Sequence, residues 1–576
     1  MVPFSFKPSQ MNSTRIVELL GAGLLAAALL LPVGDLPWFS FWREWTASLA
    51  VLLMLLGALS RLRQQARPLA IVWPGLPATA LLLALVALLQ WAAGLVPYRG
   101  DAVLVAAALA GFALCMAMAQ SLAAAERTAL ADRLAAALLS AAAVSALIAI
   151  GQWAGWVKLE MGLSLAAGRP VAHMEQANLL SSLCVLGALA AWRLYERARL
   201  GRWPGALLVA LLLAAIVLTQ SRAAFLALLA VWAAFAGTHR RLPGLVARLP
   251  ALAVASVVLT AGALLLPLLD SQLHIAGTSL EERSAAGRRP QLWQMMLEAI
   301  AQRPLAGWGV LGNGAAQFSV ADHHPSLKWF FSSAHDLPLD LMLWFGVPLG
   351  MIATAALGGA VLRRVLHAAD LPALATALSA AALLTHAMVE FPLHYLYFLL
   401  PMGLMLGTSG GDDSGQVLRL PLRSAAVLPL MALLPTLLLA LLAHDYTRLC
   451  DVRPTVEYDD QTSHFVLGAQ PPAPEVVVLD QLAAFHAFAA TPMKEGLSPT
   501  ALDGLRPPML RLPYPAAIER YAHAMALNGR REPAREALLR LCKFATVPQC
   551  DASERAWSFW QELGQPLTEW PDAAGH

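Results

Sequence analysis

Charged residues are scarce in this sequence. Asp, Glu, Lys and Arg make up 13% of its 576 residues, whereas soluble globular chains carry roughly 25%. Hydrophobic residues make up 58%, and the mean hydropathy is +0.60. This composition excludes an ordinary soluble protein. The repeated long apolar runs indicate an all-α polytopic membrane protein, in contact with membrane lipid.

Two further features are missing. The net charge is only +3, and no basic cluster is interleaved with aromatic residues, so we expect no nucleic-acid partner. The first apolar run, Ile16 to Val33, is followed by Asp35 and Pro37 rather than by a small-residue cleavage site. We therefore interpret this run as a membrane anchor and not as a cleaved signal peptide.

Cysteine is also rare, with five residues. Cys115 and Cys184 lie inside apolar runs and are expected to be inert packing residues. Cys542 and Cys550 lie eight positions apart in a polar tail, where an oxidising compartment would allow a disulfide that stabilises the tail alone. Cys450 is left over. Nothing near these cysteines completes four zinc ligands, so we predict no metal site there.

The apolar runs predict about thirteen transmembrane helices. Lys and Arg gather in alternate connections, which predicts a cytoplasmic amino terminus and an outer carboxyl tail. The predicted domains are a membrane domain over residues 1–444, with an outer loop over 270–336, and a small helical outer domain over 445–576. The predicted spans are residues 16–33, 46–60, 77–93, 102–121, 134–154, 176–192, 204–219, 223–237, 250–269, 337–361, 372–389, 393–408 and 424–444.

The outer tail contains one amphipathic helical pair. Residues Ala516–Phe544 have the apolar spacing of two helices, interrupted at Asn528 and Gly529. One helical pair is too little for a solenoid, so we predict only a small helical domain. This domain could recognise a partner protein, or it could merely cap an outer cavity.

The stretch from Gly307 to Gly350 organises the candidate site. It begins as a glycine-rich loop and places His335 directly before an apolar run that continues to about Val361. A titratable imidazole at the rim of an apolar bundle is costly to place without a use. His335 could be a general base, a metal ligand or a structural histidine. His323 and His324 invite the metal interpretation, but no cluster at ligand spacing supports it.

Three arginines are candidates for binding an anion. Arg222, in LTQSRAAFLALL, lies between two apolar runs with a short connection, so it is held at the outer rim. Its planar guanidinium suits a phosphate, although a snorkelling arginine at a helix end is the alternative. Arg288 and Arg289 open a predicted helix in the outer loop, whose amino-terminal amides favour anions. A solvated surface pair is the alternative for these two residues.

The same predicted helix has an expected apolar face. Trp293, Leu297 and Ile300 recur at helical spacing and should pack against the interior of the protein. Other polar residues are predicted at the outer ends of spans, where they could support the site or act only as caps. They are Gln176, Asn178, His386, Glu390, Tyr395 and Tyr397.

At these motifs the chain resembles the O-antigen ligase superfamily. It is most similar to the O-oligosaccharyltransferases that glycosylate pilins and other exported proteins (PglL type). The resemblance is strongest over residues 170–410 and continues into the tail segment LCKFATVPQC. Leu179 stands where the family commonly has His, and Asp336 where Asn is usual. The motifs that carry the resemblance are QSRAAF, the Arg289–Trp293 pair, GWGVLGNGAAQF, AHDLPLDLMLWFGVPLG and HAMVEFPLHYLYFLLPMGLML.

The resemblance implies a glycosyltransferase at the periplasmic face of a bacterial inner membrane. Its donor would be an oligosaccharide on a polyprenyl (undecaprenyl) diphosphate carrier, and its acceptor a Ser or Thr hydroxyl of an exported, pilin-like protein. It implies no cofactor and no metal. By motif, His335 matches the catalytic histidine, and Arg222 and Arg289 match the diphosphate-binding arginines. Ligation to lipid A core, glycan polymerisation and a lipid-linked sugar flippase remain the alternatives.

Overall fold

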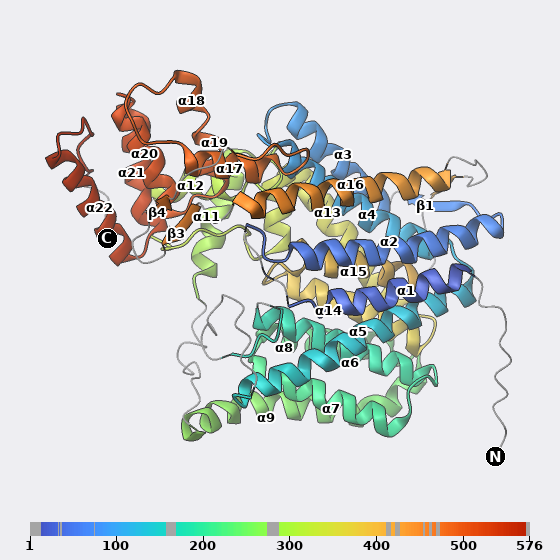
Figure 1. The fold of residues 1–576 in the computed structure, drawn as a ribbon. Helices are drawn as coiled ribbons and strands as arrows, with labels where there is room; N and C mark the ends of the chain where they lie inside the picture. Colours follow the sequence, from blue (N-terminus) through green and yellow to red (C-terminus); the bar gives the residue numbers. More distant parts are fainter. Residues whose placement is uncertain are drawn as a thin grey trace, which may run out of the picture. The chain divides into compact units, whose positions relative to one another are not determined.

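The chain folds almost entirely into helices in the computed structural model (Figure 1). The structure describes residues 13–32, 34, 37–73, 75–156, 169–174, 176–273, 287–410, 416–420, 427–452, 456–459, 464–467 and 473–571. Of the predicted outer loop, residues 274–286 lie outside this description.

Every predicted span corresponds to a helix. These helices are α1 (Ser13–Ala28), α2 (Phe41–Gln64), α3 (Leu76–Ala92), α4 (Arg99–Ser121), α5 (Ala124–Trp153), α6 (Ala177–Glu196), α7 (Arg202–Thr219), α8 (Arg222–Thr238), α9 (Leu249–Leu273), α13 (Leu337–Leu366), α14 (Leu371–Ala387), α15 (Leu396–Thr408) and α16 (Val427–Val452).

Eight helical segments among the described residues are long and apolar enough to cross a membrane. The apolar helices α3, α8, α14 and α15 are shorter, with 10–17 residues each. A helix needs about 20 apolar residues to cross a bilayer when it stands upright. The protein is therefore a polytopic membrane protein, and the figure of thirteen spans stays a prediction.

The chain divides into two compact units. Unit 1 contains residues 1–81, 108–284 and 355–439, and unit 2 contains residues 82–107, 285–354 and 440–576. Unit 2 thus joins residues 287–336 of the predicted outer loop with the polar tail. The predicted division between residues 1–444 and 445–576 was placed at the end of the last predicted transmembrane span, and it stays a prediction.

Unit 1 is built around α6. This helix packs against α5, α7, α8 and α14, and most of its residues are buried. Unit 1 also buries charge, because Glu18 on α1 accepts from Arg61 on α2 at 2.8 Å and from Arg133 on α5. A buried carboxylate is costly unless cations or donors surround it, so these ion pairs fix how the three helices pack.

Two short antiparallel sheets were not predicted. In unit 1, β1 (Leu69–Trp73) pairs with β2 (Gln416–Leu420). In unit 2, β3 (Val456–Asp459) pairs with β4 (His464–Leu467). The partners of β1 and β2 are far apart in the sequence, and four- or five-residue strands carry too little periodicity to be recognised from sequence alone.

Unit 2 contains the helices of the loop and tail. The predicted tail pair is confirmed as α20 and α21, which pack together and are separated by Asn528 and by Gly529 with φ 72°. A disulfide joins Cys542 to Cys550. The remaining elements are α11 (Arg289–Gln302), α12 (Asn313–Val320), η3 (Ala321–His323), α17 (Asp480–Ala490), α18 (Pro499–Asp503), α19 (Arg506–Arg511), α20 (Pro515–Leu527), α21 (Arg531–Phe544) and α22 (Val547–Glu562). The chain also forms η2 (Pro243–Arg248) and η4 (Pro392–His394) in unit 1.

The span beginning after His335 is not one regular helix. Within α13, Gly346 has φ 79° and ψ 163°, which interrupts the helix. The freed backbone groups bond to the preceding loop: Val347 N donates to Pro304 O at 2.7 Å, and Trp308 N donates to Leu343 O at 2.7 Å. A Cβ on Gly346 would lie 2.0 Å from the Leu305 carbonyl oxygen, so only glycine allows this approach.

Replacing Gly346 with Ala should destabilise the fold, because both the positive φ and the Leu305 backbone oppose a Cβ. We expect a loss of about 1–3 kcal/mol, the range for strained backbone sites. Gly359→Ala, on the same helix where no atom lies within 4 Å of the added Cβ, is the matched control. Thermal unfolding in detergent measures both variants. Equal melting temperatures would contradict the argument.

Candidate active site

His335 lies at the end of the connection between η3 and α13, half-buried in unit 2. Its backbone has φ 54°, a conformation that non-glycine residues adopt rarely. Its backbone N–H donates to Ser333 Oγ at 3.0 Å, and its ring meets Phe331 edge-on with 5.6 Å between centroids. A positive φ at a bulky residue points to a conformation that the surroundings impose.

A buried carboxylate imposes that conformation. Asp340, on the first turn of α13 and 2% exposed, accepts from Ser333 Oγ at 2.6 Å and from Ala334 N at 2.8 Å. It also accepts from Asn313 Nδ2 at 2.7 Å, and Asn313 Oδ1 in turn accepts from Trp344 Nε1 at 2.7 Å. This network fixes the two residues before His335, and so holds the histidine backbone in place.

The helix α11 contacts the same turn. The indole Nε1 of Trp293 donates to the Ala334 carbonyl at 3.0 Å. The predicted apolar face of this helix was partly wrong, because Leu297 is 53% exposed. The buried stripe consists of Leu292, Met295, Met296, Ala299 and Ile300. It lies a fraction of a turn away from the predicted one, since Trp293 faces the His335 turn and not the core.

Arg288 and Arg289 mark the start of α11, as predicted. Arg288 caps the helix and is exposed, whereas Arg289 is its first residue and is half-buried. Arg289 precedes Trp293 by one helical turn, so both residues lie on the same side of α11. The helix amino terminus adds partial positive charge to the two guanidinium groups. This end of α11 therefore favours an anion.

Asp336 caps the amino terminus of α13, where its Oδ1 accepts from Leu339 N at 3.0 Å. Burial raises the pKa of the Asp336 carboxyl, and the neighbouring Asp340 carboxylate adds to the rise. The residue that replaces the usual Asn next to His335 is thus a structural cap with weakened acidity.

The two histidines considered as metal ligands share one carboxylate. His323 Nδ1 lies 2.6 Å from Glu298 Oε1, and His324 Nε2 lies 2.7 Å from Glu298 Oε2. The hydrogen bond to Glu298 raises the pKa of His323. Among the described residues, no group of three or more His, Cys, Asp or Glu could hold a metal ion. Glu298 therefore joins α11 to η3 and to the residue that follows it.

In unit 1, Arg222 is the first residue of α8 and is exposed. Ser221 caps this helix through a bond from Ala223 N. The turn just before Arg222 is held by Arg169, whose Nε donates to the Thr219 carbonyl at 2.7 Å. The connection between α7 and α8 is thus tied to the segment before α6.

Arg169 belongs to a polar cluster in unit 1. Its Nη2 donates to Asn178 Oδ1 at 3.2 Å, and Asn178 Nδ2 donates to Glu390 Oε1 at 2.9 Å. Ser182, one turn after Asn178 on α6, has its Oγ 2.7 Å from Nδ1 of His386, which lies near the end of α14. The structure therefore brings together Asn178, Glu390 and the turn that carries Arg222.

The other predicted polar residues of unit 1 occupy nearby helix ends. Gln176 is the amino-terminal cap of α6 and is half-buried. Tyr395 caps α15 and stacks on Tyr397 with 5.1 Å between ring centroids. Tyr397 is completely buried, with the guanidinium of Arg43 5.6 Å from its ring centroid. Tyr397 therefore lies in the interior of the unit and not on its surface.

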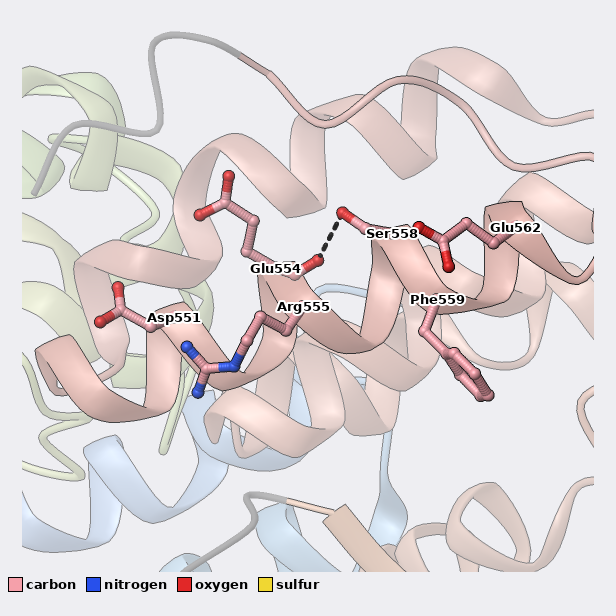
Figure 2. A pocket seen from close by; sticks show the side chains of 6 residues that line it. All are labelled: Asp551, Glu554, Arg555, Ser558, Phe559 and Glu562. Atoms are coloured by element: carbon pink, nitrogen blue, oxygen red, sulfur yellow. Dashed lines mark hydrogen bonds between the residues drawn. The ribbon is translucent and has the colours of Figure 1, made fainter.

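A surface hollow of about 460 Å³ lies elsewhere, on one face of α22 (Figure 2). None of the predicted site residues lines it. It is open to solvent, and its hydrogen bond from Ser558 Oγ to Glu554 O is local to the helix. We do not regard it as the active site. Its lining residues are Asp551, Glu554, Arg555, Ser558, Phe559 and Glu562.

Sequence reasoning missed several supporting residues. Asn313 and Asp340 lie inside the stretch that was singled out, but their pairing depends on the tertiary fold. The sequence offered one indication of this pairing: Asn313 and Asp340 are polar residues in the first turns of α12 and α13, in otherwise apolar surroundings. Arg169 was not predicted as a site residue. Its position shortly before Gln176 and Asn178 could have identified it.

Two family profiles and two relatives match this chain. The profile of the O-antigen ligase family matches residues 207–354, and that of the virulence factor membrane-bound polymerase, C-terminal, matches residues 374–545. The General O-oligosaccharyltransferase of Acinetobacter baylyi is 29% identical over 543 residues, which cover 91% of this chain and 92% of that protein.

A second relative matches a shorter part of the chain. The ComP-specific O-oligosaccharyltransferase of the same species is 25% identical over 268 residues, or 46% of this chain and 48% of that protein. No solved structure matches the chain. The matched segments cover the positions of Arg222, Arg289 and His335 and extend through α21. The chain is therefore a membrane glycosyltransferase of the O-oligosaccharyltransferase type, similar to the O-antigen ligase family over residues 207–354.

Proposed function

We propose that this protein transfers an oligosaccharide en bloc from a polyprenyl diphosphate carrier to Ser or Thr hydroxyls of exported proteins. The observation that carries the proposal is the setting of His335, which the Asp340 network and Trp293 hold beside the arginine-bearing end of α11. The reaction would occur at the periplasmic face of the inner membrane, with the amino terminus in the cytoplasm.

In the proposed reaction, His335 accepts the proton of the acceptor hydroxyl. The hydroxyl oxygen forms a bond to the anomeric carbon of the glycan as the bond from that carbon to the phosphate oxygen breaks. An ordinary imidazole titrates near neutrality, which suits a general base. The fixed backbone of His335 limits the orientations that its ring can adopt, as a positioned base requires.

The leaving group is a diphosphate, on which negative charge develops as the glycosidic bond breaks. Arg289, with Arg288, would stabilise that charge from the amino terminus of α11. The family motif assigns Arg222 to the same diphosphate, and this assignment rests on sequence. The supporting roles of Gln176, Asn178, Glu390, Tyr395 and Tyr397 also remain proposals, in which Asn178 and Glu390 brace the turn before Arg222 through Arg169.

The acceptor has a specific rival. The match to an O-antigen ligase profile favours ligation to lipid A core, and the polymerase profile favours glycan elongation. The relative that covers most of the chain is named an O-oligosaccharyltransferase, which supports a protein acceptor. Membership of a glycosyltransferase family favours transfer over the flippase alternative.

The acceptor is tested by reconstitution. Purified protein in liposomes with lipid-linked oligosaccharide should glycosylate an exported pilin-like protein, as detected by a mass shift on a Ser or Thr residue. Lipid A core offered in parallel should remain unmodified. Modification of lipid A core without any protein product would overturn the protein-acceptor proposal.

His335→Ala should lower the transfer rate by roughly two to four orders of magnitude, the usual contribution of a general base. The backbone contacts of residue 335 survive this change, so the protein should remain folded in the membrane. The exposed His367→Ala is the control. Single-turnover transfer assays on equal amounts of purified protein give the rates. A near wild-type rate for His335→Ala would remove the residue from the mechanism.

Arg222→Lys should reduce transfer by about tenfold or more, because a lysine ammonium cannot make the bidentate phosphate contact of a guanidinium. The donor KM should rise as well, since the contact already exists in the bound donor. Arg202→Lys, at the exposed start of α7, serves as the matched control. Wild-type turnover in Arg222→Lys would show that only charge matters at this position.

A further inference from the structure

The segment that leads to His335 is attached to the carboxyl end of α21. Ser326 Oγ donates to the Cys542 carbonyl at 3.0 Å and to the Lys543 carbonyl at 3.1 Å. Lys328 N donates to the Lys543 carbonyl at 3.1 Å. The last carbonyls of a helix have no partner within the helix, so here the segment itself supplies their donors.

Further contacts surround this attachment. Lys543 Nζ donates to the His324 carbonyl at 3.2 Å. Next to it, the Phe544 ring stacks on Phe318 of α12 with 6.1 Å between centroids. The end of α21 is thus held both by hydrogen bonds to residues 324–328 and by aromatic packing on α12.

The disulfide lies within this same turn of α21. Cys542 is joined to Cys550 on α22, and both residues are buried. The bridge closes a short loop around the connection between α21 and α22. It therefore restrains the helical turn whose carbonyls receive Ser326 and Lys328. Without the covalent link, the last turn of a helix is the part that frays most readily.

From Ser326 the restraint continues toward His335. Buried Gln317, on α12, donates from Nε2 to the Trp329 carbonyl at 2.9 Å and accepts from Phe331 N at 3.0 Å. The Phe331 ring in turn makes a T-shaped contact with the His335 imidazole. The segment from Ser326 to His335 is thus fixed at both ends and in its middle.

We propose that the Cys542–Cys550 disulfide and Ser326 are positioning elements for His335. The tail would then set the geometry of the general base, in addition to its own stability. This inference rests on the proposed function, because it assumes that His335 acts in transfer. It departs from the earlier expectation that the disulfide stabilises the tail alone, since the Cys542 carbonyl is itself a contact of the segment before His335.

Two variants separate positioning from folding. Ser326→Ala removes the donor and leaves the disulfide, while Cys542→Ser/Cys550→Ser removes the bridge and leaves the serine. Each should lower kcat by about tenfold, since a misplacement of about 1 Å can cost about a hundredfold. The donor KM should stay unchanged. Ser326→Thr, which keeps the hydroxyl, should restore kcat, and Cys450→Ser is the control for cysteine loss.

The combined triple variant tests whether the two elements act on one contact. Its kcat should equal that of the worse single change, because coupled residues are not additive. If a variant merely folded poorly, the amount of active enzyme would fall by the same factor for every substrate. In that case Ser326→Thr would not restore kcat. Effects that multiply independently, or kcat values within twofold of wild type, would overturn the inference.

Hydrogen exchange provides a readout independent of activity. In wild type, the amides of Lys328 and Phe331 are bonded and should exchange slowly. In both variants, peptides covering residues 326–336 should lose protection while those of α20 keep it. Thiol labelling of the wild type under non-reducing conditions should leave Cys542 and Cys550 unlabelled. If the wild type transfers no glycan, the proposed function fails, and unchanged protection in the variants would separately overturn this inference.

Discussion

The buried carboxylate of Asp340 is the interaction on which the His335 segment depends. Burial of an ionised group is costly unless hydrogen bonds compensate for lost water. Ser333, Ala334 and Asn313 supply those bonds, so the low-energy arrangement of the carboxylate is also the one that turns the chain at His335. The strained backbone of His335 is a consequence of satisfying its neighbour. Stability and site geometry are thus coupled in one network.

Gly346 also couples the stability of the fold to the geometry of the site. The break in α13 at Gly346 would be unacceptable in contact with lipid, because its freed backbone groups would lack partners. Pro304 and Trp308 of the preceding loop supply those partners. The loop that follows α11 is therefore bonded directly to the helix that follows His335. The helix α11 is thus connected to the His335 region at both ends, through the Trp293 bond near its amino end and through the backbone contacts at Gly346 beyond its carboxyl end.

Polar residues within the apolar bundle of unit 1 follow a similar rule. Asn178 bonds to both Arg169 and Glu390, and Glu18 is surrounded by Arg61 and Arg133. A lone charge in such surroundings would be costly, but a closed set of partners becomes a constraint on helix packing. The two sets differ in one respect. The Glu18 set only joins helices, whereas the Arg169 set also reaches the turn that carries Arg222.

The sequence by itself determined the membrane class, the positions of the helices, the start of α11 and the residues of the family motifs. These features depend on composition and on short periodic patterns, which act locally along the chain. Tertiary structure decided the rest. The pairing of Asn313 with Asp340, the role of Arg169, the burial of Tyr397 and the attachment of α21 to residues 324–328 all join residues distant in sequence. The buried face of α11 was misjudged for the same reason: Trp293 turns toward the carbonyl of Ala334, and no periodicity within a single helix reveals which neighbour its side chains will meet.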